Sequence, residues 1–298
     1  MSVQDLIDEG VALFKNKKFD KAIEKLNQAL DEIEDENSQI QEQINIQFWF
    51  GCCYLEQAMK SKGKIATKLF DQAVEHHQQQ LRLAEQLEDK QNGLQEQIDA
   101  RLLLGHCYFK QAMKAKGKES EQLFGQTVEH HQQQLSLAKQ LADKQNSLQE
   151  QIDAQLLLGS CYSEQAKKAK GKESEKLFGQ AVEHLQQQMG LAEQLEDKQN
   201  SLQRQIYAKF WLGRCYLEQA KKAKGKESKQ LFGQAVEHHQ QQLSLAEQLA
   251  DKQNSIQQQI YAQFELGRCY LKQAVKIKDE DSSKVKELTE KEIGRAHV

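Results

Sequence analysis

The spacing of apolar residues predicts α-helices along almost the whole chain. One apolar stripe with helical spacing follows Ser147 and comprises Leu148, Ile152, Leu158, Tyr162 and Ala166. A second stripe alternates spacings of four and three and comprises Phe178, Val182, Leu185, Met189 and Ala192. Both patterns are typical of one buried face of a helix. We therefore expect an antiparallel pair of helices, each of about 24 residues and about 36 Å.

Local signals suggest where these helices begin and end. The string S-L-Q-E at 147–150 has the form of a capping box, and Ser255 with Gln258 repeats it. We expect the first helix of this pair to end near Gly171, with that glycine as its C′ cap. The second helix should end around 197–200.

The helix pair is repeated along the chain. The string G-x-C-Y recurs every 54 residues, with its glycine at positions 51, 105, 159, 213 and 267. Such self-similarity is typical of solenoids, in which each repeat packs only against its neighbours. We predict an all-α fold, a right-handed α-solenoid of antiparallel helix pairs. It should form one domain over 1–291, with repeats 1–38, 39–91, 92–145, 146–199, 200–253 and 254–291. The last residues, 292–298, resemble a translated sequencing adapter, so we expect a non-native tail and a natural chain that continues beyond about Lys291.

The N-terminal unit carries a family resemblance. Residues 9–30, EGVALFKNKKFDKAIEKLNQAL, are similar to the tetratricopeptide pattern, with Gly10 and Leu13 on the first helix and Phe19, Ala22, Leu26 and Ala29 on the second. Later units such as 69–90 resemble the longer repeats of Pins-type G-protein-signalling modulators, kinesin light chains and bacterial signalling proteins. The resemblance covers about residues 1–277. It departs from the family in its period of 54 instead of about 34, in a longer connection within the pair, and in the absence of a proline after the second helix. It implies that the first helix of each pair lines a concave groove for a peptide.

Composition narrows the classes of function. The 298 residues include no proline, 29% are charged, and the net charge of −3 gives no general reason to expect nucleic acid or an acidic membrane as partner. No stretch approaches the roughly 18 apolar residues of a membrane span. The N-terminus lacks the layout of a signal peptide. Six cysteines without a signal peptide favour a reducing cytosol, so we expect a cytoplasmic protein.

Several recurring residues could suggest chemistry, but each has a simpler interpretation. The cysteine two positions after each repeat glycine should be a small packing residue, because one cysteine per repeat has neither zinc-site nor disulfide spacing: Cys53, Cys107, Cys161, Cys215 and Cys269. Pairs of adjacent histidines occur at 76–77, 130–131 and 238–239. The two side chains of such a pair point about 100° apart around a helix, so they cannot chelate one ion. In the fourth copy Leu185 replaces the second histidine, which indicates a packing position. Recurring lysines (60, 62, 64 and 114, 116, 118) should serve helix ends, with a weak anionic contact as the alternative. No motif for catalysis, a metal or another cofactor is present, so we expect no enzyme.

Differences between the near-identical copies concentrate on one face of the first helix. The variable positions lie three, four and seven residues apart, whereas the exposed QQQ of the second helix stays constant. Neutral drift on an exposed surface is the alternative to a binding role. We predict a partner-binding groove formed by Asn45, Phe48, Cys52, Asp99, Leu102, His106, Phe109, Asp153, Leu156, Tyr207, Phe210, Arg214, Tyr261, Phe264 and Arg268.

The groove predicts the function. Aromatic residues and arginine in its C-terminal part are typical interface anchors, so we expect a scaffold or adaptor that binds a peptide or helical segment of a partner protein, not a small-molecule substrate. Arg214 and Arg268 occupy the same position in successive repeats, each four residues after a phenylalanine, and should form two equivalent pockets for carboxylates. One alternative is a sensor module of a larger signalling protein that is truncated at its C-terminus. Another is an RNA-binding helical repeat that uses the lysines.

Overall fold

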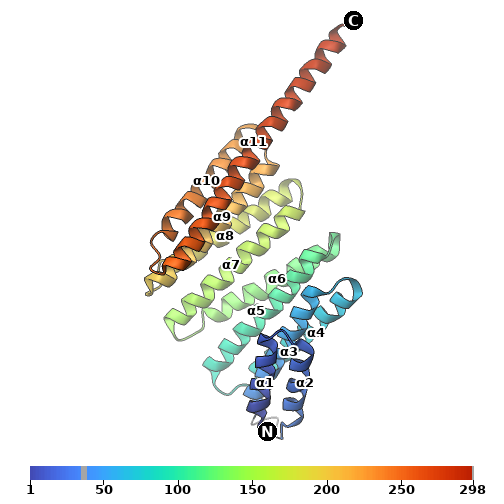
Figure 1. The fold of residues 1–298 in the computed structure, drawn as a ribbon, viewed down its shortest axis with the longest axis vertical. Helices are drawn as coiled ribbons and strands as arrows, with labels where there is room; N and C mark the ends of the chain where they lie inside the picture. Colours follow the sequence, from blue (N-terminus) through green and yellow to red (C-terminus); the bar gives the residue numbers. More distant parts are fainter. Residues whose placement is uncertain (35–38, 297–298) are drawn as a thin grey trace. The chain divides into compact units, whose positions relative to one another are not determined.

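The computed structural model describes residues 1–34 and 39–296, which are helical and contain no strand (Figure 1). Eleven helices pack in adjacent pairs within these ranges, which confirms the predicted all-α solenoid architecture. Their bounds are α1 Val3–Lys15, α2 Phe19–Asp31, α3 Ile40–Lys60, α4 Gly63–Ala84, α5 Lys90–Lys114, α6 Gly117–Ala138, α7 Lys144–Lys168, α8 Gly171–Ala192, α9 Lys198–Lys222, α10 Gly225–Ala246 and α11 Lys252–Ala296. Of the tail expected at 292–298, residues 297–298 lie outside the described residues.

The chain forms two compact units, residues 1–165 (unit 1) and 166–298 (unit 2), which divide within the C-terminal part of α7. The prediction of one continuous domain over 1–291 stays a prediction. The predicted groove residues up to Leu156 belong to unit 1, and those from Tyr207 onwards belong to unit 2.

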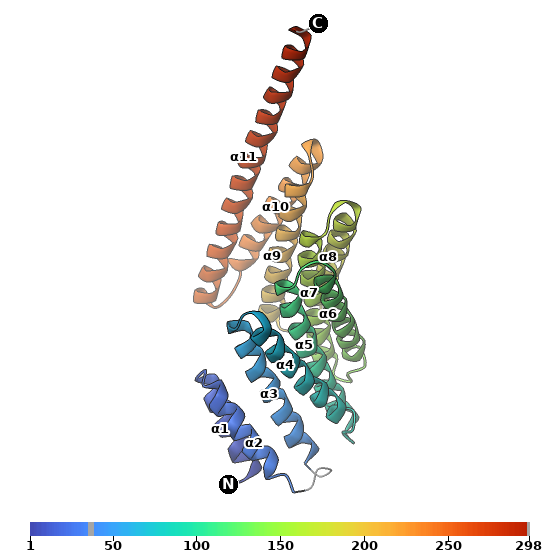
Figure 2. The same cartoon turned by 90° about the vertical axis from the view of Figure 1, so that its right-hand side faces the viewer.

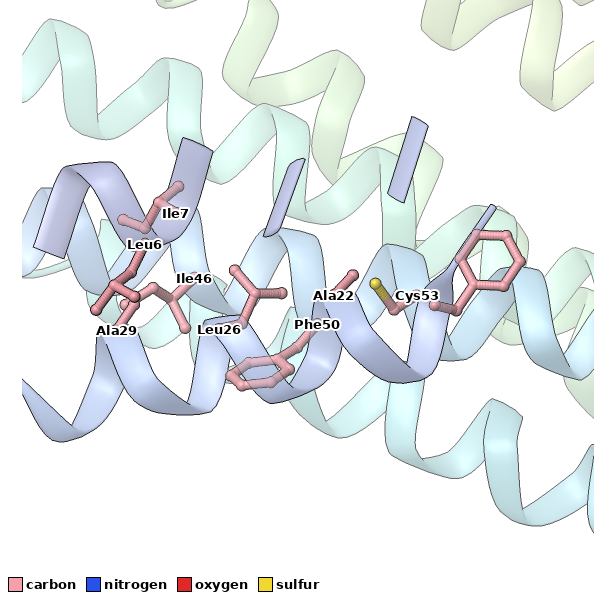
Figure 3. Close-up of a cluster of buried hydrophobic side chains, with 9 residues drawn as sticks. Leu6, Ile7, Ala22, Leu26, Ala29, Ile46, Phe50 and Cys53 are labelled. Atoms are coloured by element: carbon pink, nitrogen blue, oxygen red, sulfur yellow. The ribbon is translucent and has the colours of Figure 1, made fainter. Parts of the chain in front are cut away.

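The core of unit 1 shows how neighbouring repeats stabilise one another. Leu6 and Ile7 of α1, Leu26 of α2, and Ile46 and Phe50 of α3 share one buried cluster (Figure 3). The clusters around Phe70, Phe124 and Phe232 likewise join both helices of one pair to the first helix of the next. The buried apolar surface is therefore spread along the chain, as expected for a solenoid.

The first and second helices of the pairs form two different layers. First helices of successive pairs contact each other, namely α1 with α3, α3 with α5, and α9 with α11. Among the described residues, no such contact joins α2 to α4, α4 to α6, or α8 to α10. The first helices are therefore closer together and lie on the inner side within each unit. We call the exposed side of these first helices the inner face.

The predicted capping boxes at Ser147 and Ser255 are wrong, because an aspartate four residues earlier accepts the hydrogen bonds of the free N–H groups. Oδ1 of Asp143 accepts from the backbone N–H of Asn146 at 2.6 Å, and Oδ1 of Asp251 accepts from that of Gln253 at 2.8 Å. In α9, the N-cap is Asp197, whose Oδ1 accepts hydrogen bonds from the backbone N–H groups of Gln199 (2.8 Å) and Asn200 (3.2 Å). The serine lies one turn further into the helix. The hydroxyl of Ser147 donates to the carbonyl oxygen of Ala138 at 2.7 Å, and Ser255 makes the same bond to Ala246. The aspartate satisfies the free N–H groups, which leaves the serine to satisfy a carbonyl at the end of the preceding helix.

The prediction of Gly171 as a C′ cap is also wrong. Helix α7 already ends at Lys168, and Gly171 is the first residue of α8, with a φ of +56°. Gly63, Gly117 and Gly225 have the same conformation at the same place. Only two residues separate the helices, so the chain reverses within a very short connection. The residue with the left-handed conformation that this reversal needs is the first residue of the second helix. A side chain disfavours this region, so glycine is required there.

Candidate functional site: the inner face of the first helices

The predicted groove residues all lie on first helices, α3, α5 and α7 in unit 1 and α9 and α11 in unit 2. None of them is fully buried. The most accessible are in unit 2, where Tyr207 is 39%, Tyr261 49% and Phe264 63% exposed. These side chains are therefore available for contact with a partner.

In unit 1, the inner face carries a partly buried acidic group. The amide nitrogen of Gln95 lies 3.2 Å from Oδ1 of Asp99 and 3.2 Å from Oε1 of Glu150, so it bridges two first helices. Burial, reinforced by the negative charge of Glu150, raises the pKa of Asp99 to about 6. A second carboxylate approaching this part of the face is therefore disfavoured.

The histidine of the unit 1 face is neutral at pH 7. Burial, together with the nearby positive charge of Lys110, lowers the pKa of His106 to about 4. His77 and His131, which flank His106 from the second helices, also have a pKa lowered to about 4 by burial. His106 can therefore offer a hydrogen bond but not a positive charge.

The aromatic and sulfur-containing members of the unit 1 face serve mainly for packing. Phe48 meets Trp49 edge to face with ring centroids 4.9 Å apart, and Phe109 meets Phe124 at 6.1 Å. Burial raises the pKa of Cys52 to about 12, so its thiol is not a nucleophile at neutral pH. The cysteines two positions after the repeat glycines are completely buried, which confirms their packing role: Cys53, Cys107, Cys161, Cys215 and Cys269.

In unit 2, one arginine is held on aromatic rings without an acidic partner. The guanidinium carbon of Arg214 lies 5.4 Å from the ring centroid of Phe210 and 5.2 Å from that of Trp211. Among the described residues Arg214 has no hydrogen bond or ion pair, and its Nε is buried without an acceptor. An arginine fixed by cation–π contact keeps its planar N–H groups for a carboxylate.

The second arginine differs, so the prediction of two equivalent pockets is wrong. Nη1 of Arg268 donates to both carboxylate oxygens of Glu265 at 2.7 Å. Glu265 is only 5% exposed, and its charge neutralises Arg268. Sequence reasoning missed Glu265, although a signal was present. The position two before the repeat glycine is apolar in the other copies, which have Trp49, Leu103, Leu157 and Trp211.

The histidine doublets diverge, as predicted. In α4, His76 stacks on Tyr54 with centroids 5.3 Å apart and an interplanar angle of 7°, whereas His77 is completely buried. Leu185, at the position of the second histidine, is also completely buried, which confirms a packing position. The described residues contain no group of three histidine, cysteine or acidic side chains able to hold a metal ion.

The repeat glycines make room for these buried histidines, which sequence reasoning missed. A Cβ atom built on Gly213 would lie 2.5 Å from Nε2 of His239, and the α3–α4 and α5–α6 pairs show the same close approach of His77 to Gly51 and of His131 to Gly105. The glycine of G-x-C-Y is therefore a notch for the imidazole of the second helix.

Of the recurring lysines, those at the position of Lys114 and Lys222 bind backbone carbonyls, which confirms for this position that the lysine serves a helix end. Nζ of Lys222 lies 2.6 Å from the carbonyl oxygen of Ala166, 3.2 Å from that of Lys167 and 2.9 Å from that of Ala169. Lys114 makes the equivalent bonds to the end of α3. The helix end that each lysine caps belongs to the preceding repeat, so the lysine joins two repeats.

Comparison with protein-family models and with curated proteins gives no match for this chain. Among the described residues, none of the helices combines the length and the apolar character that a membrane span requires.

Proposed function

We propose that the protein is a non-enzymatic scaffold of tetratricopeptide-like type that binds a peptide segment of a partner protein along the inner face. The proposal extends the sequence resemblance of residues 9–30 to the whole array. The single observation that carries it is the unpaired guanidinium of Arg214 on Phe210 and Trp211. Maintaining an arginine in this state without an internal acid is useful if an external carboxylate completes the site.

The surroundings of Arg214 indicate the chemistry of the ligand. Tyr207 on the same helix and Tyr261 and Phe264 on α11 expose aromatic surface, and aromatic residues beside arginine are typical of interface anchors. We therefore propose that unit 2 binds an acidic side chain or a terminal carboxylate next to an apolar residue. The unit 1 face, with Asp99 and the neutral His106, should select polar or basic residues instead.

RNA binding through the lysines receives less support. The ammonium groups of Lys114 and Lys222 are occupied by backbone carbonyls of the preceding repeat. A phosphate would have to displace these hydrogen bonds before it could bind.

A peptide selection against the full chain tests the proposal. Random peptides displayed on phage should converge on sequences with a carboxylate beside an apolar residue. For a selected peptide, Arg214→Glu should raise the dissociation constant at least tenfold, about 1.4 kcal/mol. Arg268→Glu should have a smaller effect, because Glu265 already neutralises Arg268.

The matched control is Lys116→Glu, which reverses an exposed charge at the turn between α5 and α6. It should leave both the affinity and the melting temperature nearly unchanged. If binding survives Arg214→Glu and is lost in Lys116→Glu, the binding surface is the loop edge and the proposal is wrong.

A further inference from the structure

The start of α4 differs from the start of the later second helices in one exposed residue. Ile65, in the first turn of α4, is 68% exposed. The same position is acidic in α6, α8 and α10, which have Glu119, Glu173 and Glu227. In α4, a large apolar side chain therefore takes the place of a negative charge at a position that water reaches.

This apolar residue lies within a dense group of lysines. Residues 15–18, at the α1–α2 turn, contain three lysines, residues 60–68, at the α3–α4 turn, contain four, and neither stretch contains an acidic residue. Nζ of Lys60 lies 4.3 Å from the ring centroid of Phe19, which brings the two turns together. Both turns lie at the same end of their helix pairs in Figure 2. We call Ile65 and these lysines the basic edge, which comprises Lys15, Lys17, Lys18, Lys60, Lys62, Lys64, Ile65 and Lys68.

The lysines of the basic edge are available for an external anion. All of them are exposed. Among the described residues, the ammonium groups of Lys62, Lys64 and Lys68 have no hydrogen bond or ion pair. They differ in this respect from Lys114 and Lys222, whose ammonium groups bind backbone carbonyls.

Carboxylates border the basic edge without neutralising it. Asp20 accepts a hydrogen bond from the amide of Gln57 at 2.7 Å. Asp71 and Glu119 line, together with Lys62, a hollow of about 650 Å³ between the α3–α4 and α5–α6 turns. The lysines of the edge outnumber these carboxylates, so the local potential is positive although the net charge of the chain is −3.

Two features favour a lipid surface over a nucleic acid as the partner. Proteins that bind single-stranded nucleic acid offer aromatic rings on which the bases stack. The rings at this edge, Phe19 and Phe70, are only 8% and 2% exposed, and the ammonium groups of Lys60 and Lys114 lie over them. The exposed Ile65, in contrast, suits the boundary between headgroups and acyl chains, where apolar side chains insert and lysines meet the phosphates.

We propose that the basic edge of unit 1 binds the surface of a membrane that contains anionic phospholipids, with Ile65 inserted at the acyl-chain boundary. Each lysine near an anionic surface strengthens binding about fivefold, and burial of the isoleucine side chain adds about tenfold. The basic edge is separate from the carboxylate site at Arg214, and the proposal does not depend on peptide binding there.

Cosedimentation of the full chain with vesicles tests the proposal. The chain should bind vesicles of phosphatidylcholine with about 30% phosphatidylserine and should not bind vesicles of phosphatidylcholine alone. Binding should weaken as the salt concentration rises, because salt screens the lysines. Ile65→Gln removes the apolar side chain without changing the charge and should weaken binding about tenfold, whereas Ile65→Leu should retain it.

The repeats provide a matched pair of charge reversals. Lys64 and Lys172 are the second residues of α4 and α8, and both are exposed. Lys64→Glu should weaken vesicle binding at least tenfold. Lys172→Glu makes the same change beside Glu173, outside the basic edge, and should leave binding unchanged. Both variants should fold normally because the positions are exposed, which circular dichroism checks.

The proposal is overturned if the chain fails to bind the anionic vesicles at about 1 mM lipid, if Ile65→Gln binds them as tightly as the unaltered chain, or if the two lysine variants weaken binding equally. Preferential binding of single-stranded RNA, lost in Lys64→Glu and kept in Ile65→Gln, would overturn it in favour of a nucleic-acid surface. A peptide that requires Arg214 should bind Ile65→Gln with unchanged affinity, so failure here and failure of the carboxylate site are distinguishable.

Discussion

Adding one methyl group at Gly213 should destabilise unit 2, whereas the same change at Gly267 should stabilise it. A Cβ on Gly213 would lie 2.5 Å from Nε2 and 2.6 Å from Cε1 of His239. This imidazole is completely buried, and its Nδ1 lies 3.0 Å from Oε1 of Gln242. The ring is therefore held in place and cannot move aside without losing contacts. At Gly267, the same atom would meet nothing within 4 Å.

The two effects can be estimated separately. Alanine in place of glycine inside a helix is favourable by about 0.5–1 kcal/mol. Overpacking a well-packed interior costs about 1–3 kcal/mol. We therefore expect Gly267→Ala to raise the free energy of unfolding by up to about 1 kcal/mol, and Gly213→Ala to lower it by about 1–2 kcal/mol. The alanine gain is common to both variants, so their difference should equal the overpacking cost of about 1–3 kcal/mol.

Tryptophan fluorescence can report on unit 2 alone. The chain has two tryptophans, Trp49 and Trp211, and only the second belongs to unit 2. In a Trp49→Phe background, urea unfolding followed through Trp211 gives the midpoint for each glycine variant. Adding His239→Ala to Gly213→Ala should recover part of the loss, with a coupling energy of about 1 kcal/mol or more.

Equal midpoints for Gly213→Ala and Gly267→Ala would refute the notch. The notch would also be refuted if Gly213→Ala and His239→Ala changed the free energy of unfolding by strictly additive amounts, because the destabilisation is assigned to the contact between these two residues. Either result would mean that the repeat glycine is present for a reason other than the imidazole.

Two further predictions concern the junctions between repeats and the charge of the inner face. Lys222→Met keeps most of the side chain but leaves the carbonyl oxygens at the end of α7 without their ammonium donor, so it should lower the free energy of unfolding of unit 2 by about 1–2 kcal/mol. Lys224→Met, at an exposed position, should change it by less than about 0.5 kcal/mol, and urea unfolding measures both. The raised pKa of Asp99 means that stability present at low pH is lost as the pH rises from 3.8 to about 6. Asp99→Asn should remove this loss and be more stable than the wild type by about 1–2 kcal/mol at pH 7 but not at pH 4, whereas equal pH profiles would contradict the shift.

The candidate site was only partly predictable from the sequence, because equivalent positions in the repeats have different surroundings in the structure. Comparison of the repeat copies identified Arg214 and Arg268 as equivalent, because they occupy the same position of the period. Their environments differ because of Glu265, a single change from an apolar residue two positions before the glycine. The charge of an arginine depends on the groups that surround it in space, and equivalence in sequence does not guarantee an equal environment.

The sequence by itself determined the helices, the 54-residue period and the burial of the repeat cysteines. The helices follow from the spacing of apolar residues along each helix, and the period and the role of the cysteines follow from the recurrence of the same residues in successive copies; both are properties of the chain that need no knowledge of its neighbours in space. The tertiary structure decided what the other recurring residues do. Gly213 is a notch only because His239 of the next helix enters it, and Lys222 is a cap only because the end of α7 lies beside it. These contacts join different elements of the fold, and a residue's spacing along its own helix does not specify which neighbour it meets across a helix–helix interface.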